Sequence, residues 1–202
     1  RIEFSEHRAP DTVIDLCDVM SRTILSLQPL AHDRNVRLDL EQPAGSIAIT
    51  AKYDEIAQVI QNLVNNAIKY SAEGGRVTVT LAISASMSEA GRNAVEHVEF
   101  SSRSILLQPR ASAEAKAAWI RVRDDGPGIA RRHLSRLGER FYRADESRGG
   151  EIEGTGLGLA IVKHIMARHR GGLAVSSKED AGSVFGAWLP VTDSALPKTD
   201  AE

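Results

Sequence analysis

The sequence has a single cysteine, no long hydrophobic run and no cluster of basic residues. Cys17 lies alone in an apolar helical pattern, which excludes a disulfide framework and predicts a buried, reduced thiol. No stretch approaches the ~20 apolar residues that cross a bilayer, and no signal peptide is visible. We therefore expect a soluble, cytoplasmic segment without direct membrane contact. A net charge of −2 and the lack of a Lys/Arg-rich run give no reason to expect nucleic-acid binding.

A set of histidines with metal-ligand spacing is also missing. Five histidines have no such spacing to Cys17 or to a second histidine, and we expect surface or capping roles for them: His32, His97, His133, His164 and His169.

Length and periodicity indicate one α/β domain. At 202 residues the chain can build one well-cored domain, and no break in composition argues for two. Periodic apolar residues predict helices at 10–27, 58–70 and 159–169, and alternating stretches predict strands at 36–40, 47–50, 76–83, 120–124, 173–176 and 184–189. We expect an α/β fold, a two-layer sandwich in which helices cover one face of a mixed sheet.

A glycine run near the end of the chain is the most informative motif. Gly154-Thr155-Gly156-Leu157-Gly158-Leu159 places three glycines at every second position before an apolar helical stretch. Glycines let the backbone approach an anion closely, and a helix that begins there directs unpaired N–H groups at it. The run therefore indicates a phosphate cradle. A flexible hinge is the alternative, since the spacing fits neither the P-loop nor the dinucleotide motif.

Asparagines mark the predicted helix 58–70. Asn62 and Asn66 lie one turn apart, and Lys69 and Tyr70 follow a turn later, so the four side chains share roughly one side. Asparagine is a mediocre helix former, so its repetition in an otherwise apolar helix suggests a site. An amide oxygen can ligate Mg²⁺ without adding negative charge beside a triphosphate. A solvated polar face is the alternative.

The third motif is a strand that runs into acidic residues and a turn. Asp124-Asp125-Gly126-Pro127-Gly128 follows the alternating stretch from Ile120. A carboxylate at a strand end can accept a hydrogen bond from an amino group. The same residues are ordinary turn chemistry, so the order of the three motifs carries the interpretation.

In this order the motifs resemble those of the GHKL ATPases, and within them the ATP-binding catalytic domain of sensor histidine kinases. The resemblance covers about Asp54 to Pro190, in segments similar to the asparagine box (62–70), the first glycine box (124–128), the phenylalanine box (137–145), the second glycine box (154–159) and a weaker third one (182–185). It implies a Bergerat-type fold with ATP and Mg²⁺ as cofactors. The phenylalanine box and His169-Arg170-Gly171 are most similar to phosphate-regulon sensor kinases.

The resemblance also implies roles for single residues. Asn66 would ligate Mg²⁺ with support from Asn62, and Lys69 would contact phosphate. Asp124 would accept the adenine amino group. Arg143 would reach the γ-phosphate, where its planar fork of donors suits the spread of charge. The implied catalytic residues are Asn62, Asn66, Lys69 and Arg143. The other implied ATP-binding residues are Tyr70, Asp124, Gly126, Gly128, Ile129, Phe141, Tyr142, Gly154, Thr155, Gly156, Leu157, Gly158 and Leu159.

Three segments depart from, or add to, the family pattern. Many family members have two aromatic residues in the phenylalanine box. Here Gly138 stands at the position of the first, and only the second, Phe141, is present. Residues 144–153 are polar and correspond to the ATP lid, which we expect to be flexible. Residues 84–118 fill a gap that the family commonly closes with a short turn. There 95–100 could extend a strand, and 111–118 is expected to be disordered or briefly helical. A tolerated surface insertion is favoured over a partner-docking role.

The phosphoacceptor histidine of a kinase is absent from the sequence. In Glu6-His7-Arg8-Ala9-Pro10 the acid precedes His7 and the spacing to Pro10 is too short, so we reject His7 as the acceptor. We expect a linker from a preceding dimerisation domain at 1–10, the catalytic domain at 11–191 and a C-terminal tail at 192–202.

The resemblance thus implies a protein-histidine kinase domain that transfers the γ-phosphoryl of ATP to a histidine on a dimerisation domain, from which a response regulator receiver domain accepts it. We expect little activity in isolation, because the nucleophile is missing. The full-length kinase is expected to be a homodimer, and its anchoring in the inner membrane is left open. A degenerate module that acts by ATP-dependent lid ordering is the alternative. A chaperone- or topoisomerase-type ATPase is disfavoured, because Asn62 stands where a catalytic glutamate is expected.

Overall fold

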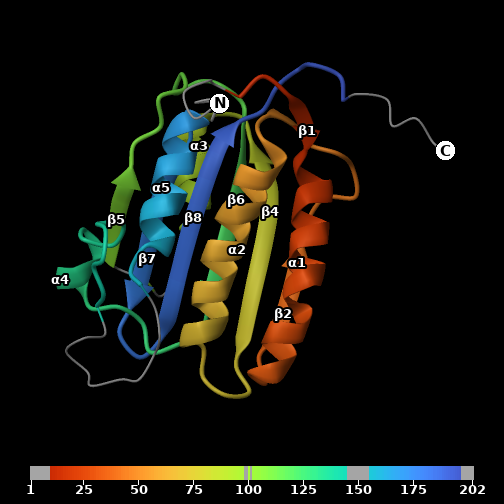
Figure 1. The fold of residues 1–202 in the computed structure, drawn as a ribbon. Coiled ribbons are helices and arrows are strands. Elements are labelled where there is room, and N and C mark those ends of the chain that lie inside the picture. Colours follow the sequence, from red (N-terminus) through yellow and green to blue (C-terminus); the bar gives the residue numbers. More distant parts are fainter. Residues whose placement is uncertain (1–9, 98–99, 101, 145–154, 197–202) are drawn as a thin grey trace, which may run out of the picture.

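A six-stranded mixed sheet forms the centre of the molecule (Figure 1). The computed structural model describes residues 10–97, 100, 102–144 and 155–196. In spatial order the strands are β2 (Arg37–Glu41), β4 (Arg76–Ser84), β6 (Ala117–Asp124), β8 (Gly182–Pro190), β7 (Gly172–Lys178) and β5 (Ser102–Leu107). The β2–β4 pair is parallel, and the other neighbouring pairs are antiparallel. The predicted hairpin 173–189 is confirmed, with β8 in the interior of the sheet.

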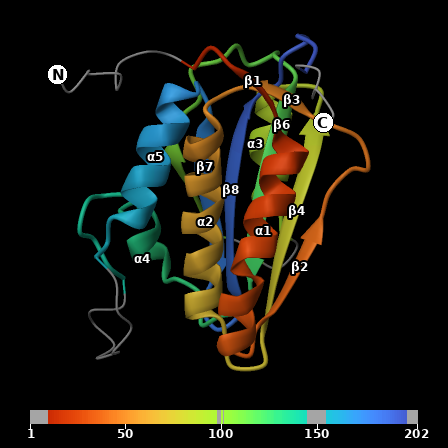
Figure 2. The ribbon, with the colours of Figure 1, turned by 45° about the vertical axis from the view of Figure 1, so that its right-hand side comes forward.

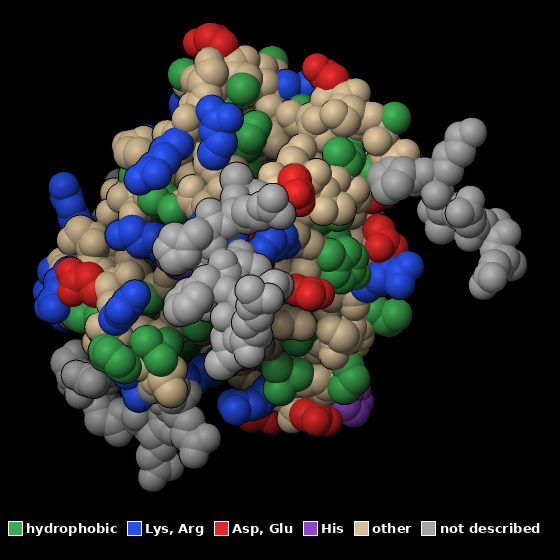
Figure 3. All heavy atoms as spheres, turned by 45° about the horizontal axis from the view of Figure 1, so that its top comes forward, with side chains coloured by type: hydrophobic (Ala, Val, Ile, Leu, Met, Phe, Trp, Pro, Cys, Tyr) green, Lys and Arg blue, Asp and Glu red, His purple; other side chains and the backbone are tan. Residues whose placement is uncertain are grey.

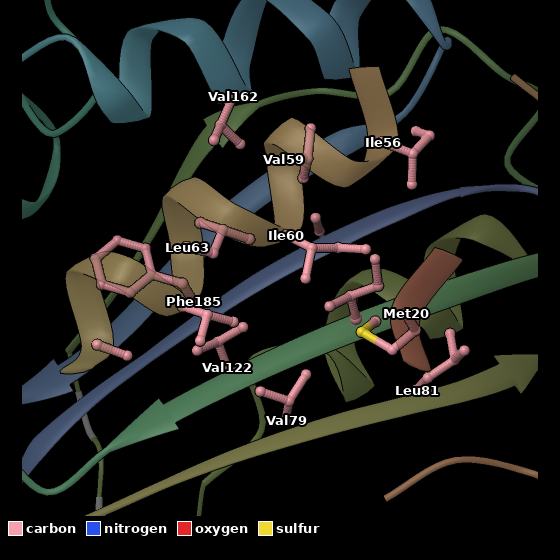
Figure 4. Close-up of a cluster of buried hydrophobic side chains, with 14 of the residues drawn as sticks. Met20, Ile56, Val59, Ile60, Leu63, Val79, Leu81, Val122, Val162 and Phe185 are labelled. Atoms are coloured by element: carbon pink, nitrogen blue, oxygen red, sulfur yellow. The ribbon is translucent and has the colours of Figure 1, made fainter. Parts of the chain in front are cut away.

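Three long helices cover one face of this sheet (Figures 1 and 2). They are α1 (Leu16–Asp33), α2 (Tyr53–Tyr70) and α5 (Gly158–Arg168). Figure 4 shows Ile60 and Leu63 of α2 directed at Val79 and Val122 of the sheet, and all four side chains are fully buried. Burial of each such side chain contributes about 1.5–3 kcal/mol. The predicted two-layer α/β sandwich is confirmed.

The first helix begins later than predicted. Residues Val13–Asp15 form strand β1, which pairs with β3 (Ala48–Thr50) in a separate two-stranded sheet. The Asp15 carboxylate accepts hydrogen bonds from the backbone amides of Cys17 and Ile47, each at 3.0 Å. Asp15 therefore caps α1 at Leu16, and the prediction of a helix from Pro10 was wrong. The expected buried, free thiol of Cys17 is confirmed.

The start of α2 is fastened to the end of α5. No side chain caps α2, and the Lys52 amide instead donates to Nε2 of the buried His169 at 3.2 Å. Nδ1 of the same ring donates to the Ile165 carbonyl at 2.8 Å. Burial lowers the pKa of His169, which favours the neutral ring that this acceptor role requires. Arg168 and Glu55 join the same helix ends by an ion pair at 2.6 Å. His169 is thus a capping residue, and it lies in the interior.

The described residues of the segment 84–118, which are 84–97, 100 and 102–118, are an ordered part of the fold. Helix α3 (Met87–Asn93) lies on the sheet face opposite the long helices, and β5 adds a strand beside β7 (Figure 1). A second hydrophobic cluster forms under α3 around Trp119 and Trp188, which are 8% and 3% exposed. A Cβ at Gly91 of α3 would lie 2.9 Å from the Trp188 ring, so helix and ring are in close contact.

The local predictions for this segment need correction. The described residues of 95–100 form no strand, and those of 111–116 form no helix. Ala117 and Ala118, expected at the end of a disordered or helical stretch, begin β6. The seven residues of α3 are too few to show a helical period, and contacts with the distant β8 stabilise it.

Several predictions fall outside the described residues. These are the lid at 144–153 apart from Ala144, the linker apart from Pro10, Gly154, and 197–202 of the tail. The Thr192 amide, placed in the predicted tail, donates to the Ala48 carbonyl at 3.0 Å. No helix of the described residues is long and apolar enough to cross a membrane. Figure 3 shows both Lys or Arg and Asp or Glu side chains on one face of the molecule, with most of the Lys and Arg side chains on the left of the view.

Candidate nucleotide-binding site

A cavity of about 380 Å³ brings residues of all five predicted boxes together. It lies between α2, the turn after β6, the segment that follows α4 (Arg131–Leu134), and the start of α5. Its volume falls within the range of small-molecule sites. The predicted residues that line it are Asn62, Asn66, Lys69, Tyr70, Asp124, Gly128, Ile129, Tyr142, Arg143, Thr155, Gly156, Gly158 and Leu159.

Three described residues of the predicted set do not line this cavity. Gly126 lies behind Asp124 and donates its amide to that carboxylate. The Phe141 side chain is 69% exposed and points away from the interior. Leu157 serves as the N-terminal boundary of α5. Gly154 is outside the described residues.

Among the described residues that line the cavity, Asp124 is the one with a carboxyl group. It ends β6 opposite Ser183 of β8 and is 4% exposed. Burial raises its pKa to about 7, and hydrogen bonds from the backbone amides of Gly126 and Ser183 oppose that rise. An ionised carboxylate has about four acceptor sites, so those not used by the two amides can accept from an amino group in the cavity.

The adjacent acid has a different environment. Asp125 is exposed, and its Oδ2 accepts a hydrogen bond from the Arg76 amide at 2.8 Å. Asp125 therefore joins the end of β6 to the start of β4 and lies outside the cavity lining. Of the two neighbouring carboxylates, that of Asp124 lines the cavity and that of Asp125 connects two strands.

Glycine is required at two points of the cavity wall. Gly128 has a φ of 66°, and a Cβ there would lie 1.9 Å from the Lys178 carbonyl oxygen. Gly156 has a φ of 68°, and a Cβ there would lie 2.7 Å from the Phe141 carbonyl carbon. Both positions combine left-handed backbone with close approach of another main chain, so any side chain would displace the wall.

The two amides of α2 face the first residue of α5. A Cβ at Gly158 would lie 3.2 Å from Asn62 Oδ1 and 3.9 Å from Asn66 Nδ2. Asn65, between them in sequence, is exposed and lies outside the cavity lining. Among the described residues no group of three or more His, Cys, Asp or Glu could hold a metal ion. An amide oxygen is a hard ligand of the kind that Mg²⁺ accepts, so Asn62 and Asn66 could hold this ion together with water and ligand oxygens.

The charge of the cavity lining favours an anion. The described part of the lining has three cationic side chains, those of Lys69, Arg132 and Arg143, and one carboxyl group, that of Asp124. Lys69 and Tyr70 lie together, with the Lys69 ammonium 5.3 Å from the centre of the Tyr70 ring. The unpaired amides at the start of α5 add to the positive potential. The described lining thus offers one buried carboxyl group that can bind a nucleobase, and several hydrogen-bond donors that can bind phosphates.

Some lining residues were missed or were given another role. Ser183 and Phe185 line the cavity, in agreement with the weaker third glycine box that contains them. His133, expected at the surface or in a cap, also lines it and contacts Tyr142. Pro127, Leu137, Gly138 and Ala144 also line the cavity; they belong to the first glycine box and the phenylalanine box but were given no role as ligand contacts. No motif pointed to Ala130 and Arg132. Ala130 precedes α4 and Arg132 lies in it, and four residues are too few to show a helical period.

The glycine in the phenylalanine box has a structural reason. Gly138 has a φ of 96°, a conformation that side-chain-bearing residues rarely adopt. It lies in the cavity wall, and a Cβ there would lie 3.6 Å from the Lys163 side chain. An aromatic residue at this position would require a different backbone conformation. The observed backbone therefore requires glycine at position 138.

Comparison with known proteins identifies the family. Residues 51–193 match the family described as Histidine kinase-, DNA gyrase B-, and HSP90-like ATPase. The chain belongs to this family. The match includes every motif that lines the cavity, and the nucleotide of a domain in this ATPase family is ATP.

Relatives of this ATPase domain are sensor kinases. The chain is 35% identical over 158 residues to the phosphate regulon sensor protein PhoR of Pseudomonas aeruginosa, which covers 78% of this chain and 29% of PhoR. It is 29% identical over 161 residues to the sensor histidine kinase WalK of Bacillus subtilis, which covers 80% of this chain and 22% of WalK. The chain thus spans under a third of the length of these two relatives.

Solved structures share the fold of this ATPase domain. The histidine kinase domain of the E. coli osmosensor EnvZ has a TM-score of 0.55 and 29% identity, over 98% of this chain and 99% of that one. The mycobacterial sensor histidine kinase MprB has a TM-score of 0.62 at 23% identity, over 90% and 97%. The second likeness supports the fold alone.

Proposed function

We propose that this chain is the ATP-binding catalytic domain of a two-component sensor histidine kinase, at about 11–191. It binds Mg²⁺-ATP and supplies the γ-phosphoryl group to a histidine of a dimerisation domain. The observation that carries the proposal is that Asn66, Asp124 and Arg143, which come from three separate motifs, line one cavity. The sensor kinases among its relatives support the same function.

In this proposal Asp124 determines which nucleobase binds. Asp124 accepts a hydrogen bond from the adenine amino group, where guanine carries a carbonyl oxygen that cannot donate. The triphosphate extends toward the start of α5 and the cations of the cavity. Asn66 would hold Mg²⁺ with support from Asn62, and the ion would supply positive charge beside the phosphate oxygens. Lys69 and Arg143 hold the phosphates by charge-assisted hydrogen bonds.

The proposed transfer needs a second domain. The bond between the γ-phosphorus and the β,γ-bridging oxygen breaks, a phosphorus–nitrogen bond forms to the acceptor imidazole, and ADP leaves. The described residues of this chain position and stabilise the phosphates, whereas the dimerisation domain supplies the nucleophile and the group that takes its proton. A receiver domain of a response regulator then accepts the phosphoryl group on an aspartate. The full-length kinase is proposed to be a homodimer.

Titration calorimetry tests the proposal directly. The chain is titrated with a non-hydrolysable ATP analogue, with and without Mg²⁺, and with GTP as control. Binding that is selective for adenine and strengthened by Mg²⁺ is expected. If neither nucleotide binds, the kinase proposal is overturned. The degenerate alternative has no observation in its favour, because the residues it would be expected to lose line the cavity.

Asn66→Asp is expected to change Mg²⁺ dependence more than base preference. The added negative charge beside the phosphates should lower affinity for the ATP analogue without Mg²⁺ by about tenfold, and affinity with Mg²⁺ much less. The ratio of adenine to guanine affinity should not change. Asn65→Asp, on the same helix but outside the cavity, is the matched control and should behave as wild type. Equal effects of the two variants would show that Asn66 has no metal role.

Nucleotide affinity is expected to fall as the pH decreases through 7. Asp124 has a pKa of about 7 in the unliganded domain, so below this pH its carboxyl becomes neutral and accepts the amino group less well. Between pH 8 and pH 6 the affinity for ADP should fall by up to about tenfold. Asp124→Asn removes this dependence and leaves the titration of the ADP phosphates, so the difference between the two profiles isolates Asp124. Parallel profiles would contradict the assignment.

A further inference from the structure

His133 of α4 makes a short contact with Tyr142 at the cavity. The distance from His133 Nδ1 to the Tyr142 hydroxyl oxygen is 2.5 Å, and both side chains line the cavity. The hydroxyl donates to an unprotonated Nδ1, or a protonated Nδ1 donates to the hydroxyl oxygen. The contact can therefore form whether or not Nδ1 of His133 carries a proton.

The Tyr142 ring is also held on its face. The Arg136 guanidinium lies 4.1 Å from the ring centre, and its Nη2 is 3.2 Å from Glu139 Oε2. The salt bridge orients the guanidinium over the ring, and the histidine fixes the hydroxyl end. Two independent contacts thus determine where Tyr142 lies.

The residue before Tyr142 has an unusual backbone. Phe141 has a φ of 64°, and its amide donates to the Gly156 carbonyl at 3.1 Å. This conformation costs free energy in a residue with a side chain, and it persists where surrounding contacts determine it. With this backbone the Phe141 side chain is exposed whereas Tyr142 and Arg143 line the cavity. The contacts of Tyr142 therefore help to hold Arg143 at the cavity.

The helix that carries His133 has firm support. Leu134 is 2% exposed, and α4 packs against β5 and β7. Strand β5 belongs to the segment 84–118, so this segment supports a wall of the cavity from outside. His133 consequently presents its ring from a fixed base.

We propose that His133 is a positioning residue that holds Tyr142, and through it Arg143, at the phosphate end of the cavity. The proposal rests on the proposed function, because the group that Arg143 meets there is the γ-phosphate of ATP. His133 acts through its neighbour. Its effect should therefore appear in the difference between ATP and ADP affinity.

The test uses the whole chain with His133→Leu, Tyr142→Phe, the double variant and the conservative His133→Gln. Calorimetry gives the affinities for a non-hydrolysable ATP analogue and for ADP, each with Mg²⁺.

His133→Leu and Tyr142→Phe should each lower affinity for the analogue by about five- to tenfold and affinity for ADP by less than about twofold. The double variant should lose no more than either single one. Gln can accept from the hydroxyl, so His133→Gln should retain most of the affinity. His164→Leu, at an exposed position outside the cavity, is the matched control.

Three results would overturn the proposal. They are unchanged affinities in both single variants, equal losses for ADP and the analogue, and losses that multiply in the double variant. These outcomes leave wild-type ATP binding intact and therefore leave the proposed function standing. If the wild-type chain itself binds no ATP analogue, the proposed function and the positioning role fail together.

Discussion

Asp124→Asn is expected to weaken binding of the ATP analogue by about 10- to 100-fold and to abolish the preference for adenine over guanine. A hydrogen bond to a charged group contributes about 1.5–3 kcal/mol, and each 1.4 kcal/mol is a factor of ten in affinity. Asp124 is the one carboxyl that the described residues contribute to the cavity lining, so no described neighbour there can replace it. Calorimetry with the ATP analogue and with GTP measures both effects.

The same substitution should not destabilise the unliganded domain. Burial raises the pKa of Asp124 from 3.8 to about 7, so the folded state binds this proton more tightly than the unfolded chain. The contribution of Asp124 to stability therefore falls as the pH rises between these two values. Asn carries no charge and can still accept the Gly126 amide. At pH 8 the melting temperature of Asp124→Asn should be equal to or above that of wild type.

Asp125→Asn is the matched control for this pair of effects. Asp125 is the adjacent acid but lies outside the cavity lining, and its partner is the Arg76 amide. Its replacement should leave nucleotide affinity unchanged and alter stability by at most about 1 kcal/mol. If both variants lost affinity equally, the loss would reflect the charge of the region, and Asp124 would not be the base-selecting residue.

Gly128→Ala is expected to destabilise the domain by at least about 3 kcal/mol, which lowers the melting temperature of a chain of this size by about 6–12 °C. The new Cβ would lie 1.9 Å from the Lys178 carbonyl oxygen, and the backbone has a φ of 66°. Strain and a main-chain clash act together there. Urea unfolding of the unliganded chain measures the change.

Two other glycines separate the causes. Gly74 has a φ of 75° with nothing within 4 Å of a Cβ, so Gly74→Ala should cost about 1 kcal/mol from backbone strain alone. Gly45 has open space and an ordinary φ, so Gly45→Ala should change stability by less than about 0.5 kcal/mol. If Gly128→Ala cost no more than Gly74→Ala, the close approach of β7 would not be a constraint on this wall.

The sequence was sufficient for the central elements and for most of the cavity lining. Helix α2 and strand β4 have long, regular patterns of apolar residues, so local periodicity was enough to predict that they exist, although α2 begins at Tyr53 and not at Gln58. The cavity could be predicted because Asn66, Asp124 and the Gly156 region carry chemistry at a characteristic spacing. Each of these motifs is short in sequence, and the fold brings them together.

The features that were missed depend on contacts between distant residues. The apolar spacing of Val13 and Leu16 continues a helical pattern, and only pairing with β3 makes Val13–Asp15 a strand. Helix α3 has seven residues and depends on Trp188, which lies almost one hundred residues later. The proposed role of His133 depends on the left-handed backbone of Phe141. The residue types in this segment do not predict that conformation.

The cover that α3 provides also determines what fluorescence can report. Both tryptophans of the sequence lie in the cluster beneath α3, behind the sheet, and neither lines the cavity. Their emission should therefore follow exposure of the rear face and change little on addition of ATP. Tyr70 and Tyr142, which do line the cavity, are the natural chromophores for ligand binding. One unlabelled protein thus carries separate optical signals for its two faces.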